Sequence, residues 1–161
     1  MSELEMKIEA LIRCVGAEAY EKAMTEIQNV ESPKPAPFPP VDIDADIENA
    51  VQKILVELGT PAHIKGYRYT VTGIRLVVNN PDLIDAITRE LYPQIATAHK
   101  TTPSRVERAV RHAIEVTWDR GDLDTLAEYF GNTISITKGK PTNSEFLAML
   151  SNVIRRKLNI R

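Results

Sequence analysis

The chain has 161 residues, of which 43% are hydrophobic and 26% are charged, and this composition is typical of a globular protein with a hydrophobic core. No stretch approaches the roughly 18 apolar residues that span a bilayer, and the first residues are acidic and polar rather than basic and then apolar. We therefore expect no membrane span and no secretory signal, and we expect a cytoplasmic protein. The only cysteine, Cys14, excludes an internal disulfide and a cysteine-rich zinc cluster.

The net charge of −2 is unevenly distributed along the chain. Residues 1–50 hold 11 acids and 4 bases, a net charge of −7, whereas residues 51–161 hold 11 acids and 16 bases, a net charge of +5. A positive C-terminal part is compatible with a polyanionic partner, although many solvated surfaces carry as much charge. Net charge therefore does not decide the function.

Apolar residues at helical spacing predict an acidic amphipathic helix over residues 1–30, either continuous or broken at Gly16. Residues 31–40 contain five prolines. Because proline lacks a backbone donor and favours extended conformations, we interpret residues 31–45 as a linker between two helical units. A proline-motif ligand for another protein is the alternative interpretation.

Three aspartates occur at every second position where the linker ends and the next unit begins, namely Asp42, Asp44 and Asp46. Their spacing lacks the glycine turn and the terminal glutamate of an EF-hand loop, so we interpret them as the N-cap region of the next helix and predict no bound metal. The apolar stripe over residues 47–58 predicts a first core helix, and Gly59 is suited to a left-handed C-terminal cap.

The stretch of residues 64–78 fits no single period. Its β-branched and aromatic residues favour a strand, whereas Gly66 and Gly73 suit neither a strand nor a helix, so the pattern leaves the choice open. Asn80-Pro81-Asp82 is a typical helix start with proline in the first turn. We expect Pro93 to break or restart that helix, which then continues to residue 100.

The remaining pattern is almost wholly helical. Thr101-Thr-Pro-Ser104 predicts a turn and an N-cap, after which an unbroken helical pattern runs to residue 120, so two helices meet at a tight turn. A short helix over residues 122–130 and an extended loop over residues 133–140 follow. Thr142-Asn-Ser-Glu145 is a capping box that opens a final helix.

The helix over residues 102–120 has two faces, because winding it at about 100° per residue separates an apolar arc from a polar one. The polar arc holds seven residues: Ser104, Arg105, Glu107, Arg108, Arg111, His112 and Glu115. An arginine can donate two hydrogen bonds to guanine and a glutamate can accept one from cytosine, so this face has the chemistry needed to read DNA. The alternative is a solvated face in which Glu107 and Arg111 form an i,i+4 ion pair.

Four strings of residues occur in one order: LGTPAHIKGY at 58–67, LYPQIA at 91–96, TTPSRVERAVRHAIEVTW at 101–118 and KPTNSEF at 140–146. They closely resemble the effector domain of the stage-zero sporulation response regulator family of endospore-forming bacteria. The resemblance covers about residues 46–158. It implies an all-α, six-helix DNA-binding effector domain over residues 46–161 that contains a helix-turn-helix, and it assigns residues 66–78 to a helix.

The resemblance also implies the roles of single elements. Residues 82–99 would form the positioning helix, and residues 103–119 would form the recognition helix in the major groove of double-stranded DNA. The base-reading positions of the family fall on Glu107, Arg108 and Arg111. The candidate phosphate contacts are Ser104, Arg105, Lys138 and Lys140.

Regulators of this family carry a receiver domain of roughly 120 residues, which the first 40 positions cannot hold. We therefore expect no phosphoacceptor, control by something other than phosphorylation, and an N-terminal helix that acts as an oligomerisation or partner element. We also expect a homodimer on DNA. The resemblance implies that the short helix over residues 123–130 contacts the sigma subunit of RNA polymerase.

His63, His99 and His112 are scattered, no serine or cysteine lies in a nucleophile context, and the glycines form no phosphate loop. We therefore predict no enzyme and no cofactor. The leading hypothesis is a sequence-specific DNA-binding transcription regulator. The alternative is a receiverless paralogue that modulates or antagonises a full-length regulator by protein–protein contact.

Overall fold

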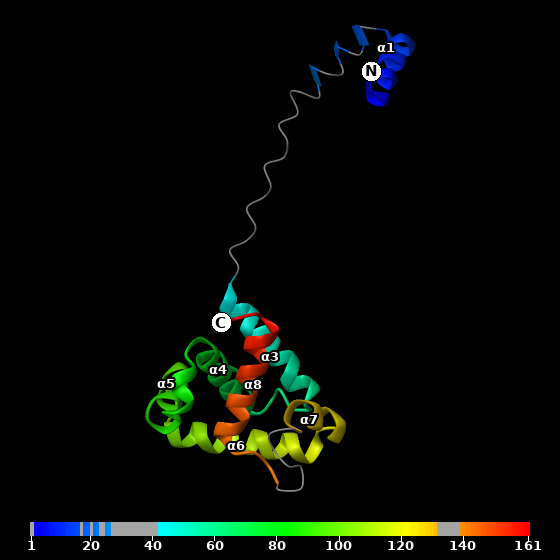
Figure 1. Cartoon of the computed structure of the whole chain (residues 1–161). Coiled ribbons are helices and arrows are strands. Elements are labelled where there is room, and N and C mark those ends of the chain that lie inside the picture. The colour runs from blue at the N-terminus through cyan, green and yellow to red at the C-terminus, as the bar shows by residue number, and fades with distance from the viewer. Residues whose placement is uncertain (1, 17, 20, 23–24, 27–41, 132–138) are drawn as a thin grey trace. The chain divides into compact units, whose positions relative to one another are not determined.

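The computed structural model describes residues 2–16, 18–19, 21–22, 25–26, 42–131 and 139–161, and all regular structure in these ranges is helical (Figure 1). The chain divides into two compact units, Met1–Val41 and Asp42–Arg161. The all-α class expected from the sequence is thus confirmed. None of the helices in these ranges combines the length and the apolar character that a bilayer crossing requires.

The first unit contains α1 (Glu3–Val15), which begins with a capping box. The Ser2 hydroxyl accepts a hydrogen bond from the Glu5 backbone N–H, and the Glu5 carboxylate accepts one from the Ser2 backbone N–H. The helix ends at Gly16, whose φ of +85° is a conformation that favours glycine. A continuous helix over residues 1–30 is therefore wrong, although the described residues between 18 and 26 are helical. The proline-rich stretch 31–40 lies outside the described residues.

The second unit begins with α3 (Ile43–Glu57). The Asp42 carboxylate accepts a hydrogen bond from the Ala45 backbone N–H at 3.2 Å, so the predicted N-cap is confirmed. The predicted apolar stripe is buried, and Gly59, with φ +80°, follows the end of the helix. The aspartate at position 44 accepts a hydrogen bond from the Asn79 side chain at 2.7 Å and so joins this helix to the next.

The stretch that the pattern left undecided is α4 (Lys65–Asn79), a helix at the centre of the second unit. Its most extensive contacts are with α3, α6 (Pro103–Arg120) and α8 (Asn143–Lys157). Because neighbours cover it on several sides, apolar and hydroxyl side chains are buried around most of its circumference. Its exposed polar residues, Lys65, Arg68 and Asn79, are confined to one narrow stripe. Its many β-branched and aromatic residues explain why the sequence pattern also favoured a strand.

The segment expected to be one helix over residues 82–99 is divided into three parts, and the continuous helix is wrong. A 3-10 turn, η1 (Pro81–Ile84), is followed by a π-helical turn, η2 (Ile87–Leu91), and then by α5 (Tyr92–Ala98). Pro93 has no N–H to donate, and in a regular α-helix its ring would clash with the carbonyl four residues earlier. The backbone N–H of Tyr92 instead reaches back five residues to the carbonyl of Ile87. The expected restart at Pro93 is confirmed.

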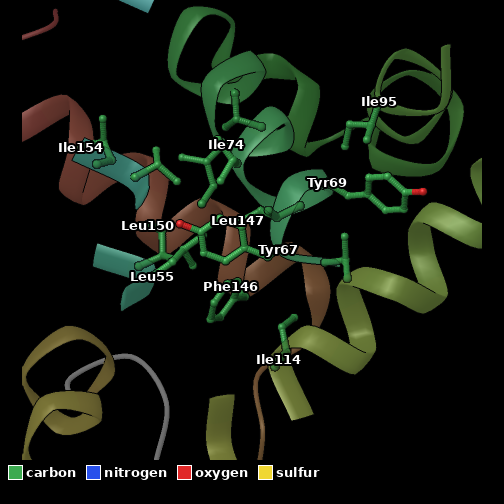
Figure 2. Close-up of a cluster of buried hydrophobic side chains, with 14 of the residues drawn as sticks. Leu55, Tyr67, Tyr69, Ile74, Ile95, Ile114, Phe146, Leu147, Leu150 and Ile154 are labelled. Carbon is green, nitrogen blue, oxygen red and sulfur yellow. The ribbon is translucent and has the colours of Figure 1, made fainter. Parts of the chain in front are cut away.

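α6, α7 (Leu123–Phe130) and α8 complete the second unit, with α5 adjoining the first turn of α6 and α7 following its last turn (Figure 1). The capping box predicted for α8 is present between Thr142 and Glu145. Ile74, Leu147 and Leu150 point toward one another in the core that α4 and α8 share (Figure 2). The single core therefore fixes the position of α6 against both α4 and α8.

Candidate nucleic-acid interface

The candidate site is built on two helices, α5 and α6, that meet at a four-residue turn over residues 99–102. The turn is closed by a hydrogen bond from the Thr101 N–H to the Ala96 carbonyl at 2.9 Å, with Lys100 at a φ of +50°. The Thr102 hydroxyl accepts from the Arg105 N–H at 3.4 Å and caps the start of α6. The tight turn and N-cap predicted from the sequence are confirmed.

The two predicted faces of α6 are present in the structure. Val106, Val110, Ala113, Ile114 and Thr117 are buried. On the opposite side, six of the seven polar residues are exposed, namely Ser104, Arg105, Glu107, Arg108, Arg111 and His112, while Glu115 is half-buried. The fold therefore gathers the three candidate base-reading residues and two of the candidate phosphate contacts on one exposed face.

The contact between α4 and α6 is unusually close at Gly66. A Cβ atom at this position would collide with the backbone carbonyl of Ala109 and would lie 2.8 Å from the Ala113 Cβ atom. Only glycine allows the two helices to approach to this distance. The axis of α6 is therefore set in part by a residue that has no side chain.

A buried amide also holds α6 in place. Asn143, at the first position of α8, donates from its Nδ2 atom to the Tyr92 hydroxyl on α5 at 3.0 Å and to the Glu107 carbonyl on α6 at 3.1 Å. Burial raises the pKa of the Tyr92 phenol, so the phenol stays protonated at neutral pH. One side chain thus ties three helices together behind the exposed face.

Arg111 is oriented by the segment before α8. Its Nη1 atom donates to the Pro141 carbonyl at 3.3 Å. Among the described residues no ion pair joins Glu107 to Arg111, so the proposed i,i+4 pair is not formed. A guanidinium has five N–H donors, and this bond occupies one of them, which leaves the others available to a ligand.

Of the two lysine candidates, the structure describes only Lys140. Lys140 forms an ion pair with Asp119 at 3.0 Å, near the C-terminal end of α6. Arg105 and Asp119 are about 21 Å apart along the helix axis at 1.5 Å per residue, so Lys140 is not close to the first turn of α6. Lys138 lies outside the described residues.

The structure places three further cations near the first turn of α6 that sequence reasoning missed: Lys65 and Arg68 on α4 and Lys100 in the turn. Beside them, the His99 Nε2 atom lies 2.8 Å from the Thr72 hydroxyl, and its ring packs edge-on against Tyr69. Desolvation, followed by the charges of Arg68 and Arg75, lowers the pKa of His99. No sequence pattern indicated this cluster, because its members come from two segments about 35 residues apart along the chain.

A polar helix face that a tight two-helix turn presents on a compact helical domain defines a helix-turn-helix protein of the DNA-binding class. Residues 51–154, from within α3 to within α8, match the family model described as "Sporulation initiation factor Spo0A C terminal". The chain belongs to this family, which is a family of DNA-binding domains in transcription regulators of sporulation and not a class of enzymes.

Proposed function

We propose that this chain is a sequence-specific transcription regulator that inserts the exposed face of α6 into the major groove of double-stranded DNA. The observation that carries the proposal is the separation of the two α6 faces, with Glu107, Arg108 and Arg111 exposed together above a fully buried stripe. A helix that reads bases must present its side chains from a fixed axis. The Gly66 contact and the Asn143 tie supply that rigidity.

The base-reading roles follow from the chemistry of the three side chains. Arg108 makes no hydrogen bond or ion pair with any described residue, so its guanidinium is available for a bidentate contact to guanine O6 and N7. Arg111 lies three residues further along, on the next turn, where the Pro141 carbonyl orients it. The Glu107 carboxylate is suited to accept from a cytosine amino group.

The proposed phosphate contacts surround these residues. Ser104 and Arg105 lie in the first turn of α6, where the positive end of the helix dipole favours an anion. The contact would come from their side chains, because Pro103 has no N–H and the Thr102 hydroxyl already accepts from the Arg105 N–H. Lys140 would exchange its Asp119 partner for a phosphate, and an exposed ion pair of this kind contributes at most about 1 kcal/mol, so the exchange costs little. We retain Lys138 as a further contact on the sequence alone.

We further propose that the protein binds DNA as a homodimer and that the N-terminal unit promotes self-association. The supporting observation is that α1 exposes two large apolar side chains within its unit, Met6 at 53% and Leu11 at 56%. Association of two such helices would remove these side chains from water, which favours self-association. We propose a contact of α7 with the polymerase sigma subunit on the resemblance of the sequence alone, because one exposed side chain there, Leu123 at 66%, does not by itself indicate a partner.

The same exposed residues of α1 favour a second candidate function, in which the chain modulates a full-length regulator by protein contact. The two functions differ in what they require of α6. A regulator that acts on DNA needs Arg108 and Arg111 for its effect on transcription, whereas a modulator that acts through α1 alone does not.

A genome-wide map of the DNA bound by the full chain tests the proposal. We expect discrete bound sites that share a sequence motif, and we expect the Arg108→Ala variant to lose occupancy at those sites. A map in which Arg108→Ala occupies the same sites as the unaltered protein would favour recruitment through another protein. A map with no shared motif would contradict sequence-specific binding.

A further inference from the structure

A cavity of about 290 Å³ lies between α4, the helix-turn-helix turn and the first turn of α6. Its lining includes Lys65, Arg68, Tyr69, His99, Lys100 and Arg105. The volume is just below the roughly 300–1,000 Å³ of sites for drug-sized ligands, so the cavity suits a smaller group. Tyr69 is buried, and it therefore offers no open ring face on which a base could stack.

The lining is strongly and uniformly positive. Four of its residues carry a full positive charge, and no carboxylate contributes to it among the described residues. None of the four cations takes part in the ion pairs that the described residues form. Lys65 and Arg68 lie three residues apart on α4, so they share one face of that helix and repel each other. Such a cluster costs folding free energy unless an anion binds to it.

The cavity is also continuous with the proposed DNA-binding face. Arg105 lines it and belongs to the exposed face of α6. The first turn of α6, an 18-residue helix, contains no acidic residue that would neutralise the positive end of its dipole. An anion held here would therefore lie beside a helix that we propose to enter the major groove.

We propose that this cavity is a phosphate site in which Lys65, Arg68 and Lys100, together with Arg105, hold one phosphate of the DNA backbone. The site fixes the register of α6 on the duplex, because a phosphate contact positions a protein without reading the sequence. The inference rests on the proposed DNA binding and extends its contact surface from α6 onto α4. The His99 imidazole lies against the site and reports its occupancy. Desolvation is the first cause of its lowered pKa and the charge of Arg68 is the second, and a bound phosphate offsets the Arg68 charge.

The test measures how the affinity of the full chain for duplex DNA depends on salt. The variants are Lys65→Gln and Arg68→Gln, and the matched controls are Lys53→Gln on α3 and Arg156→Gln on α8, both exposed cations outside the cavity. Each neutralised phosphate contributes about 0.9 to the slope of log K against log salt. Because the site holds one phosphate, we expect the Lys65→Gln/Arg68→Gln double variant to reduce that slope by up to about 0.9 and each single variant by part of that amount. The reduction should be equal on a selected site and on a scrambled duplex, while the controls retain the full slope.

The outcomes separate this inference from the proposed function. Unchanged slopes for Lys65→Gln and Arg68→Gln, in a protein that still prefers its selected site, would overturn the phosphate site and leave the function standing. Reduced slopes without any preference for the selected site would support the phosphate site and contradict sequence-specific binding. A protein that binds no duplex would contradict both. Thermal unfolding followed by circular dichroism checks the fold of each variant, and we expect these exposed substitutions to leave it intact.

A second arm distinguishes a backbone phosphate from a free anion. Inorganic phosphate is titrated into the full chain at constant ionic strength while the NMR signals of His99 are followed. If the cavity holds a phosphate of the DNA backbone, we expect the pKa of His99 to be higher in the duplex complex than in the free protein. We also expect the variants to have reduced salt slopes. Saturable binding of inorganic phosphate with unchanged salt slopes would show a site for a free anion and would overturn the proposal.

Discussion

Replacing Asn143 with alanine tests how firmly α6 is held. Asn143 is 7% exposed and donates to Tyr92 and to the Glu107 carbonyl, so Asn143→Ala removes this donor from one buried acceptor, the Tyr92 hydroxyl, and from one part-buried acceptor, the Glu107 carbonyl. Two neutral hydrogen bonds contribute about 1–3 kcal/mol together. The substitution also removes the Asn143 Oδ1 atom, which is buried and has no partner among the described residues, so part of the loss is offset. We expect a decrease of about 1–2 kcal/mol in the free energy of unfolding.

The assay is urea unfolding followed by the fluorescence of Trp118, the only tryptophan, whose ring centroid lies 5.1 Å from that of Phe130 in the core. Asn152→Ala is the matched control, because Asn152 is exposed on the same helix. Tyr92→Phe removes only the hydroxyl and should cost about 0.5–1.5 kcal/mol. The two losses should be less than additive in the double variant, since both substitutions remove one shared hydrogen bond. Additive losses, or an Asn143→Ala variant as stable as the control, would show that the hydrogen bonds of Asn143 do not stabilise the position of α6.

Three further predictions follow from the packing and the charges. Gly66→Ala should destabilise the protein by about 1–3 kcal/mol and weaken DNA binding, because its Cβ would collide with the Ala109 carbonyl, would lie 2.8 Å from the Ala113 Cβ and would force α6 outward. Gly73→Ala, whose Cβ would meet only the ends of the Ile95 and Leu147 side chains, is the control for urea unfolding. Deleting residues 1–40 should leave the fold and the affinity for a single DNA site intact but reduce self-association in light scattering; an unfolded product would contradict the unit boundary. Because the folded-state pKa of His99 is below the unfolded value of 6.5, its contribution to stability is present above pH 6.5 and is lost as the pH falls through and below that value. In His99→Gln the free energy of unfolding should depend less on pH in this range. An unchanged pH dependence would show that groups other than His99 cause it.

The helix ends could be predicted from the sequence because capping is local chemistry. The Thr142 and Glu145 pair and Gly59 are recognisable within a few residues, and the structure confirms both. The two faces of α6 were predictable for a similar reason, since one side of that helix is exposed and the other is buried. Local signals of this kind can be recognised without knowing which other helices pack against the segment.

The remaining features depend on tertiary contacts. α4 is buried by several neighbouring elements around most of its circumference, so the β-branched and aromatic residues that fill its sequence favour a strand as much as a helix. The π-helical turn before Pro93 depends on how the chain accommodates a proline ring in a packed segment. The sequence shows Asn143 only as a residue of a capping box. Its hydrogen bond to Tyr92 could not be predicted, because the two residues are 51 positions apart along the chain. The cationic cavity likewise exists only when α4 and the turn are brought together. The sequence alone does not show which distant residues come into contact, so these features could not be predicted from it.

The most direct test of sequence-specific recognition is an equilibrium titration of the unaltered protein, Arg108→Ala and Arg111→Ala on a selected site and on a scrambled duplex. His112→Ala is the control, since His112 is exposed on the same face but has no assigned contact. We predict that each arginine variant loses about 1–3 kcal/mol on the selected site, roughly 5- to 150-fold in affinity, and much less on the scrambled duplex. Equal losses on both duplexes, or losses no larger than that of the control, would contradict base reading by α6.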